Sequence, residues 1–230
     1  MSYREELINS IEPNFIFSKK PLNRFKFDEI KNNNKSLNKI EQINELKKLI
    51  DSIQNCNLKK NSKPLILGDG NIDSPIMIIG EAPGLQEEEV GKTFQGESGV
   101  LLEKMLEAIN IQKKDIFSSY AINFRPPEDR KPTSQEIKRY SVFLKELISI
   151  IDPKIIILFG STAMESVTSS NERISNERGK WKEIILRNKT YPLMITFSPS
   201  YLLRFPENKK FSWEDLKRIR QKILDLKIKF

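Results

Sequence analysis

Hydrophobic residues occur along the chain in short uninterrupted runs and in longer periodic segments. The clearest run is IIILF at residues 155–159, and a shorter one, IMII at residues 76–79, ends at Gly80. Continuous apolar runs of this length are typical of strands that are buried on both faces of a sheet. Further strands are expected within residues 115–124, at 182–186 and at 193–197.

Apolar residues at helical spacing predict amphipathic helices between these strands. One helix follows Thr133 and Glu136, which have the spacing of a capping box. Thr162 and Glu165 repeat that spacing and predict the start of another helix. Other apolar faces are expected over residues 40–53, over residues 101–109 and, from Ser212 on, at Trp213, Leu216, Ile219, Ile223 and Leu226.

The alternation of strands and helices predicts an α/β domain with a mostly parallel sheet that helices cover on both faces. This domain is expected to span residues 63–230, whereas residues 1–62 are interpreted as an N-terminal extension with helical and irregular parts, including a short helical start. In such sheets the ligand site lies in the loops beyond the carboxyl ends of the strands.

The composition limits the chemistry that those loops can carry. The chain has 0 His and 1 Cys, which excludes Ser-His-Asp and Cys-His nucleophilic sites, histidine-bound metals and an internal disulfide. The formal net charge of +8 favours a polyanionic partner, with the Lys- and Asn-rich composition of an AT-rich genome as the alternative explanation. Because no apolar run is long enough for a membrane span and no signal peptide is recognisable, we expect a cytoplasmic protein without a membrane partner.

The loop after the first apolar run has the composition of a binding turn. It reads Gly80-Glu81-Ala82-Pro83-Gly84, and its glycines allow a tight turn and close approach to a ligand. The Glu81 carboxylate, at the end of a strand, is placed to activate water. The alternative is an ordinary turn with a solvated glutamate.

Three other segments offer contacts for a nucleic acid. Phe94 stands in a flexible loop, where an aromatic ring can stack on a base; the alternative is a ring that caps the core. Residues 197–204 place two leucines beside Arg204, which suits insertion between base steps; the alternative is a helix start that buries both leucines. Residues 125–132 add a rigid, basic loop, or simply a solvated one.

The order of these motifs resembles that of the family 4 uracil-DNA glycosylases. The motifs are GEAPG, GKTFQGESGVLLEKML, RPPEDRKPTSQEI, PKIIILFGSTA and TFSPSYLLRFPENKKFSWEDL, within a match over residues 63–226. The resemblance implies a three-layer α/β/α sandwich with a central, mostly parallel four-stranded sheet. It also implies a monomeric base-excision repair enzyme that flips uracil out of DNA and hydrolyses its N-glycosidic bond.

The resemblance assigns roles to individual residues. Catalysis falls to Glu81, which places the attacking water, and to Ser198, which faces the leaving base. The residues expected to bind the base are Gly80, Ala82, Pro83, Gly84, Phe94 and Tyr120. The loop that enters the DNA is expected to include Ser200, Tyr201, Leu203 and Arg204; in the basic loop described above, Arg125 and Arg130 are also expected to contact DNA.

Two pocket positions depart from the family pattern. Ser198 stands where the family has a histidine that donates a hydrogen bond to the leaving uracil, and its hydroxyl is a shorter, neutral donor. Tyr120 stands where the family has an asparagine that pairs with the uracil edge, and it offers one hydroxyl in place of a donor and an acceptor. Asn123 takes that role if the loop is shifted.

The iron–sulfur cluster of many family members is expected to be absent. Cys56 matches the first cysteine of the family pattern, while Lys59, Phe124 and Tyr140 occupy the other three positions. Because such clusters take four thiolates, we expect no metal or other cofactor here and a packed core in its place.

Three functions are compatible with the sequence. The favoured one is an active DNA glycosylase for uracil or another deaminated base. The second is a catalytically impaired DNA-binding relative of the same fold, which would bind DNA in a salt-dependent manner without releasing a base. The third is a small-molecule-binding α/β domain whose charge reflects genome composition.

Overall fold

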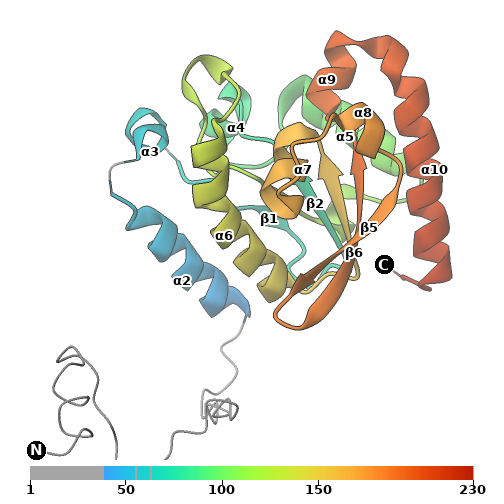
Figure 1. Ribbon diagram of the computed structural model, residues 1–230, viewed down its shortest axis with the longest axis horizontal. Helices are drawn as coiled ribbons and strands as arrows, with labels where there is room; N and C mark the ends of the chain where they lie inside the picture. Colours follow the sequence, from blue (N-terminus) through green and yellow to red (C-terminus); the bar gives the residue numbers. More distant parts are fainter. Residues whose placement is uncertain (1–38, 55, 63, 230) are drawn as a thin grey trace, which may run out of the picture. The chain divides into compact units, whose positions relative to one another are not determined.

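The computed structural model describes residues 39–54, 56–62 and 64–229, and it follows the alternation of strands and helices (Figure 1). The helical start expected near the N-terminus lies outside these residues. The strands are β1 (Asp69–Gly70), β2 (Ile76–Gly80), β3 (Phe117–Tyr120), β4 (Ile155–Phe159), β5 (Trp181–Leu186) and β6 (Lys189–Thr196). The α-helices are α2 (Lys39–Asp51), α3 (Asn57–Asn61), α4 (Leu85–Val90), α5 (Gly96–Glu107), α6 (Ser134–Ile151), α7 (Ser161–Thr168), α8 (Ile174–Glu177), α9 (Pro199–Arg204) and α10 (Lys209–Asp225).

The strands form one sheet with the order β1-β3-β2-β4-β6-β5. The central strands β3, β2, β4 and β6 are parallel, and β1 and β5 pair antiparallel at the two edges. The predicted mostly parallel sheet is confirmed, but it has six strands in place of the expected four. Beyond the four parallel strands, the sheet has a two-residue strand, β1, which the sequence did not predict, and the edge strand β5, which was predicted at residues 182–186 and has exposed outer positions.

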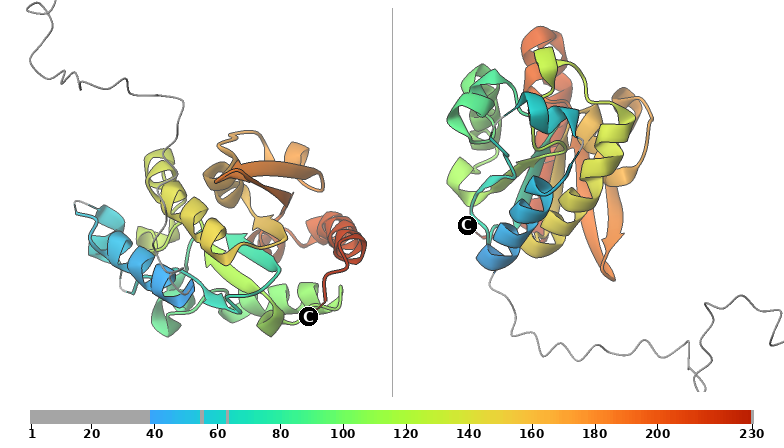
Figure 2. Two further views of the ribbon diagram at one scale, coloured as in Figure 1. Left: turned by 90° about the horizontal axis from the view of Figure 1, so that it is seen from below. Right: turned by 90° about the vertical axis from the view of Figure 1, so that its left-hand side faces the viewer.

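Helices cover both faces of the sheet, as the predicted sandwich requires (Figures 1 and 2). Side chains alternate between the two faces along a strand. Met77 and Ile79 therefore pack with α2, α6 and α7, whereas Ile76 and Ile78 pack with α5, α9 and α10. No helix in the described ranges combines the length and apolar character that crossing a bilayer requires.

Helix α6 begins as predicted. The Thr133 hydroxyl accepts a hydrogen bond from the Glu136 N–H at 3.3 Å, and the Thr133 N–H donates to the Glu136 carboxylate at 2.8 Å. This reciprocal cap satisfies two N–H groups that the first turn leaves without helical partners. Helix α2 packs against α6 through Leu46 and Ile50, so residues 39–51 contribute to the same core.

Two helix starts differ from the prediction. Helix α7 begins at Ser161, so Thr162 lies inside the helix and is not its N-cap. The Thr162 N–H donates to the Glu81 carboxylate. The predicted capping box of Thr162 with Glu165 was therefore wrong. Helix α10 begins at Lys209 and buries Ser212, Leu216 and other residues of that face. Trp213 and Leu226, predicted to point inward, are 42% and 38% exposed, because Trp213 lies beside that face and Leu226 follows the last residue of the helix.

The parallel strands end side by side. Gly80 of β2 pairs with Tyr120 of β3, and Phe159 of β4 pairs with Thr196 of β6. The loops that follow these four strands therefore leave the sheet at the same edge, which is where ligands bind in sheets of this kind.

Candidate active site

A cavity of about 690 Å³ opens at this edge of the sheet. Its wall includes Gly80, Tyr120, Gly160 and Phe197, which lie at or just beyond the ends of the four parallel strands. A volume of this size is within the range of pockets that bind small organic groups.

Most of the predicted site residues meet in this cavity. Its wall contains Gly80, Glu81, Ala82, Pro83, Gly84, Phe94, Tyr120, Arg130, Ser198, Ser200, Tyr201 and Arg204. Arg125 and Leu203 lie outside the wall. Segments more than a hundred residues apart in sequence thus form one site.

Glu81 is oriented by the start of α7. Its Oε1 accepts hydrogen bonds from the Thr162 N–H at 3.1 Å and the Ser161 hydroxyl at 3.4 Å. Gly160, which has φ of 101°, leaves room for this carboxylate, because a Cβ at that position would lie 2.3 Å from the Glu81 Cδ. With Oε1 held in this way, Oε2 is the oxygen available to a water molecule in the cavity.

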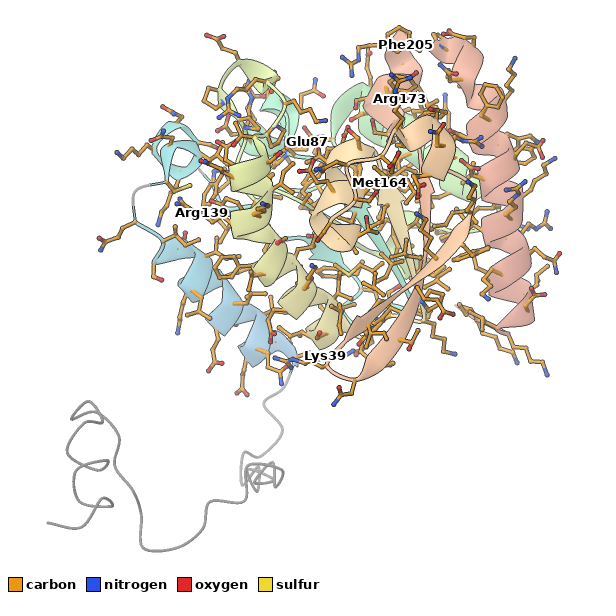
Figure 3. All side chains as sticks on the ribbon, in the orientation of Figure 1. Lys39, Glu87, Arg139, Met164, Arg173 and Phe205 are labelled. Atoms are coloured by element: carbon orange, nitrogen blue, oxygen red, sulfur yellow. The ribbon has the colours of Figure 1, made fainter. Side chains whose placement is uncertain are left out.

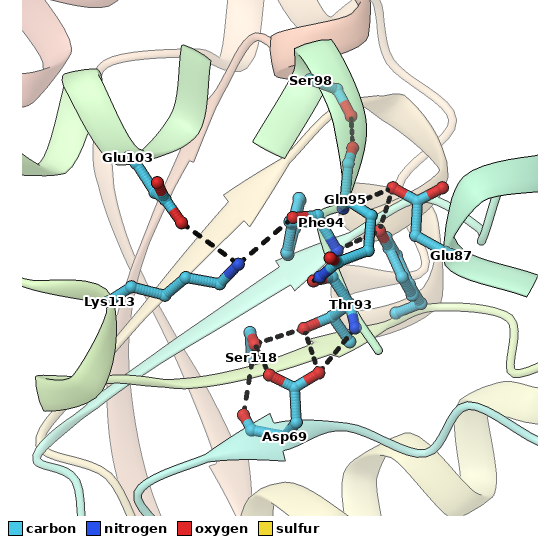
Figure 4. Close-up of polar contacts among 10 residues, drawn as sticks. Asp69, Glu87, Thr93, Phe94, Gln95, Ser98, Glu103, Lys113 and Ser118 are labelled. Atoms are coloured by element: carbon cyan, nitrogen blue, oxygen red, sulfur yellow. Dashed lines mark hydrogen bonds and ion pairs between the residues drawn. The ribbon is translucent and has the colours of Figure 1, made fainter. Parts of the chain in front are cut away.

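A buried carboxylate, Glu87, fixes the loop that carries Phe94 (Figure 4). It accepts from the N–H groups of Gly84 and Gln95, each at 3.0 Å. Beside it, the Tyr120 hydroxyl accepts from the Phe94 N–H at 2.8 Å and donates to Glu87 at 3.3 Å. The same loop is also anchored at Thr93, the residue before Phe94, whose N–H donates to the Asp69 carboxylate at 2.6 Å.

Phe94 serves both the core and the cavity. It is 5% exposed, and its ring lies 5.0 Å from that of Tyr120 and 6.4 Å from that of Phe159. Its φ of 48° is in the left-handed region, which the surrounding hydrogen bonds hold. The ring therefore packs on the core and also forms part of the cavity wall, so the two alternatives for this residue are not exclusive.

Tyr120 does not present its hydroxyl to the cavity as a free group. The hydroxyl is occupied by Phe94 and Glu87, and burial together with the Glu87 charge raises the pKa of the phenol well above its usual range. Tyr120 therefore stays neutral, and its contribution to the cavity wall is its ring. Asn123, the alternative partner for the base, donates to the Ile66 carbonyl at 3.0 Å and lies outside the cavity wall.

Replacing Tyr120 by Phe is expected to lower the free energy of unfolding by about 1–3 kcal/mol, because the buried Phe94 N–H loses its acceptor. Urea denaturation measures this difference. Tyr191→Phe is the control, since that hydroxyl bonds to the partly exposed Asp152 and its loss is expected to cost less. Equal losses in the two variants would contradict the assigned role of the Tyr120 hydroxyl.

Ser198 caps helix α9 and faces the cavity. Its Oγ accepts from the Tyr201 N–H at 3.3 Å and lies 3.1 Å from the Ser200 Oγ. When Ser200 donates in that second contact, the Ser198 hydroxyl hydrogen is free to point at a ligand. The side chain is thus both a helix cap and a neutral donor in the cavity.

A buried ion pair supports the strand that leads to Ser198. Arg178 contacts Asp215 of α10 at 2.5 Å, and the Thr196 hydroxyl donates to the same carboxylate at 2.7 Å. Asp215 is fully buried, and the Arg178 guanidinium also lies 5.5 Å from the Phe197 ring centroid. The pair therefore joins α10 to the end of β6, just before the cavity loop.

The arginines of the 125–132 loop are paired with carboxylates. Arg125 contacts Glu88 at 3.1 Å and Asp129 at 2.7 Å. Arg130 contacts Glu136 at 2.7 Å, and this bond lowers the pKa of Glu136 to about 2. Both arginine charges are thus balanced within the protein, so their predicted contact with DNA requires these pairs to open or be shared.

The positions that match cluster cysteines in the family are filled by core residues. The Cys56 thiol lies 3.2 Å from the Tyr140 hydroxyl, and the Phe124 and Tyr140 rings meet edge to face at 6.2 Å. All three side chains are buried, while Lys59 forms an ion pair with Asp51 at 3.9 Å. One thiol, two aromatic rings and a lysine do not fit an iron–sulfur cluster, which needs four thiolates.

The sequence interpretation missed several residues that shape the site. Glu87 was assigned no role, although its spacing from Gly84 is that of a capping pair. The residues next to Arg178 and Asp215 in the sequence do not indicate that the two form an ion pair. Ser161 was assigned no role either, because its contact with Glu81 spans 80 positions of sequence.

The fold and the cavity define a class of protein: a doubly wound α/β domain with a carboxylate-bearing pocket for a small organic group at the carboxyl edge of a parallel sheet. The family model of the Uracil DNA glycosylase superfamily matches residues 67–218. The chain belongs to the uracil-DNA glycosylase superfamily, which confirms the resemblance seen in its motifs.

Curated relatives are similar over most of the chain. The type-4 uracil-DNA glycosylase of Thermotoga maritima is 33% identical over 168 residues, which cover 72% of this chain and 86% of the relative. That of Pyrobaculum aerophilum is 31% identical over 168 residues, covering 71% and 86%. That of Archaeoglobus fulgidus is 28% identical over 184 residues, covering 78% and 92%.

Proposed function

We propose that this protein is a base-excision repair enzyme that hydrolyses the N-glycosidic bond of uracil, or of another deaminated base, flipped out of DNA. The observation that carries the proposal is the held Glu81 carboxylate in a cavity that can admit a base, in a chain of this superfamily. The relatives named as type-4 uracil-DNA glycosylases support the same activity. They give no support to a catalytically impaired relative.

In the proposed reaction the extruded base enters the cavity beside Phe94. Glu81 orients a water molecule, whose oxygen bonds to C1′ as the C1′–N bond breaks, and the carboxylate takes the proton of the water. The base leaves as an anion, and the Ser198 hydroxyl donates toward its developing charge. The net charge of +8 supports attraction of the DNA backbone.

The missing histidine is expected to slow this reaction rather than prevent it. Loss of one well-placed donor lowers the rate of an enzyme by about 10²- to 10³-fold, and Ser198 replaces part of that donor. Because Tyr120 offers its ring in place of an amide, discrimination between uracil and other deaminated bases then depends on the backbone of residues 80–84 and on cavity shape.

We also propose that the protein acts as a cytoplasmic monomer and needs no metal or iron–sulfur cluster. The packed contact of Cys56 with Tyr140 supports the last point, since it occupies the region where a cluster would be held. DNA is the proposed partner.

The test is incubation with oligonucleotides that carry one uracil, one hypoxanthine or only normal bases, followed by alkaline cleavage at abasic sites. We expect cleavage at the uracil position and none in the normal strand. Tight, salt-dependent DNA binding without cleavage of any strand, with activity gained in a Ser198→His, Tyr120→Asn variant, would instead favour the impaired relative.

A further inference from the structure

Three aromatic rings form a continuous row from the cavity wall to the surface, which we call the aromatic ladder. Phe197 and Tyr201 stack with ring centroids 4.9 Å apart, and Tyr201 and Phe205 are also 4.9 Å apart. Phe197 and Tyr201 line the cavity, whereas Phe205 is 44% exposed outside its wall. Figure 3 shows Phe205 between α9 and α10.

The ladder is held in place by helix α9 and by hydrogen bonds at its carboxyl end. Tyr201 lies within α9, while Phe197 precedes the Ser198 cap at the start of the helix and Phe205 follows its last residue, Arg204. The Phe205 N–H donates to the Tyr201 carbonyl at 2.9 Å, and the Asn208 amide donates to the Tyr201 hydroxyl at 3.2 Å. A preorganised ring at the surface loses little conformational freedom when a ligand stacks on it.

The charges around Phe205 indicate the kind of partner that it suits. Residues 199–213 contain Arg204, Lys209 and Lys210 but one carboxylate, Glu207. Arg204, Lys209 and Lys210 are exposed, as are the neighbouring rings of Phe211 and Trp213. Exposed aromatic rings interleaved with cations are typical of surfaces on which unpaired bases stack while cations contact phosphates.

We propose that Phe205 is a stacking platform for an unpaired DNA base next to the flipped nucleotide, and that single-stranded DNA is therefore the preferred substrate. The inference rests on the proposed function, because it takes the base in the cavity to be the flipped one. In a duplex the neighbouring bases are paired and stacked on each other, so their faces are closed to Phe205 unless more base steps are opened.

The test is fluorescence anisotropy with labelled 15-nucleotide DNA, without uracil, as a single strand and as a duplex. Phe205→Ala is expected to weaken single-strand binding by about tenfold and to affect duplex binding much less. Phe205→Tyr should bind like the wild type, whereas Phe205→Leu, which keeps apolar bulk but loses the aromatic face, should bind like Phe205→Ala. Ile185→Ala on β5, at a 73% exposed apolar position, is the control and should change nothing.

A second measurement locates the stacked base. Strands with a uracil nucleotide that resists hydrolysis (2′-fluorinated at its sugar) and a single base-free nucleotide on its 5′ or 3′ side are bound to wild type and to Phe205→Ala. The proposal predicts that one of the two base-free strands binds wild type about tenfold more weakly but binds the variant unchanged. The proposal would be overturned if removing the neighbouring base weakened binding equally in wild type and Phe205→Ala, or if Phe205→Leu bound single strands as tightly as wild type. Binding of uracil-free DNA does not need hydrolysis. If the protein releases no base but its Phe205 variants show the predicted differences in single-strand binding, the proposed function is refuted and the stacking role of Phe205 is retained.

Discussion

Replacing Glu81 by Gln is expected to lower the rate of uracil release by about 10²- to 10³-fold. The amide has the shape of the carboxylate and keeps an oxygen for the Thr162 N–H, so the loop is expected to stay in place. It is not basic enough to take a proton from water, and the chemical step loses its acceptor. Single-turnover kinetics on a uracil oligonucleotide measure the effect, with urea denaturation to show unchanged stability.

Two further variants separate chemistry from placement. Glu89→Gln, at an exposed position of the same segment, is the matched control and should keep the wild-type rate. Gly160→Ala leaves Glu81 intact but puts a Cβ 2.3 Å from its Cδ and forces alanine into φ of 101°. It is expected to displace the carboxylate and lose most of the activity. A Glu81→Gln rate within threefold of wild type would refute the role of this carboxylate.

The largest loss of stability is expected at Asp215. Asp215→Asn leaves the mostly buried Arg178 without its countercharge, which typically costs about 3–5 kcal/mol of unfolding free energy. Activity should fall as well, because the pair supports the strand before Ser198. Urea denaturation measures the stability, and Glu214→Gln on the same helix is the control. Its partner Lys217 lies 2.7 Å away, but both side chains are about half exposed, so a loss below about 1 kcal/mol is expected.

The reason for this loss is an unpaired buried charge rather than missing attraction. The double variant Arg178→Met, Asp215→Leu removes both charges and is expected to be more stable than Asp215→Asn alone. If the double variant loses as much unfolding free energy as the Arg178→Met and Asp215→Leu single variants together, the two residues act independently, contrary to the geometry of the pair.

Elements that depend on local pattern were predictable from the sequence. The β4 strand coincides with the apolar run 155–159, and α6 begins after the Thr133 cap, because burial on both faces and a reciprocal cap leave signals within a few residues. The mostly parallel sheet and the loops that form the site follow from the same alternation. The identity of most cavity residues came from the order of motifs.

What the sequence did not reveal depends on contacts between distant segments. Thr162 was assigned to a capping box, but its N–H is taken by Glu81 from another loop. Glu87 gains its role only when Tyr120 and Gln95 are brought to it. Arg125 was expected at DNA, yet Glu88 and Asp129 balance its charge in the fold. Local residue patterns do not record such pairings.

The most direct test of the account is mass-spectrometric detection of the free base after incubation of the protein with a single-stranded oligonucleotide carrying one uracil. The account predicts release of one uracil per strand, with an abasic site left behind, and loss of that release in Glu81→Gln. A uracil strand that remains intact after prolonged incubation, with the protein folded and bound to the DNA, would contradict it.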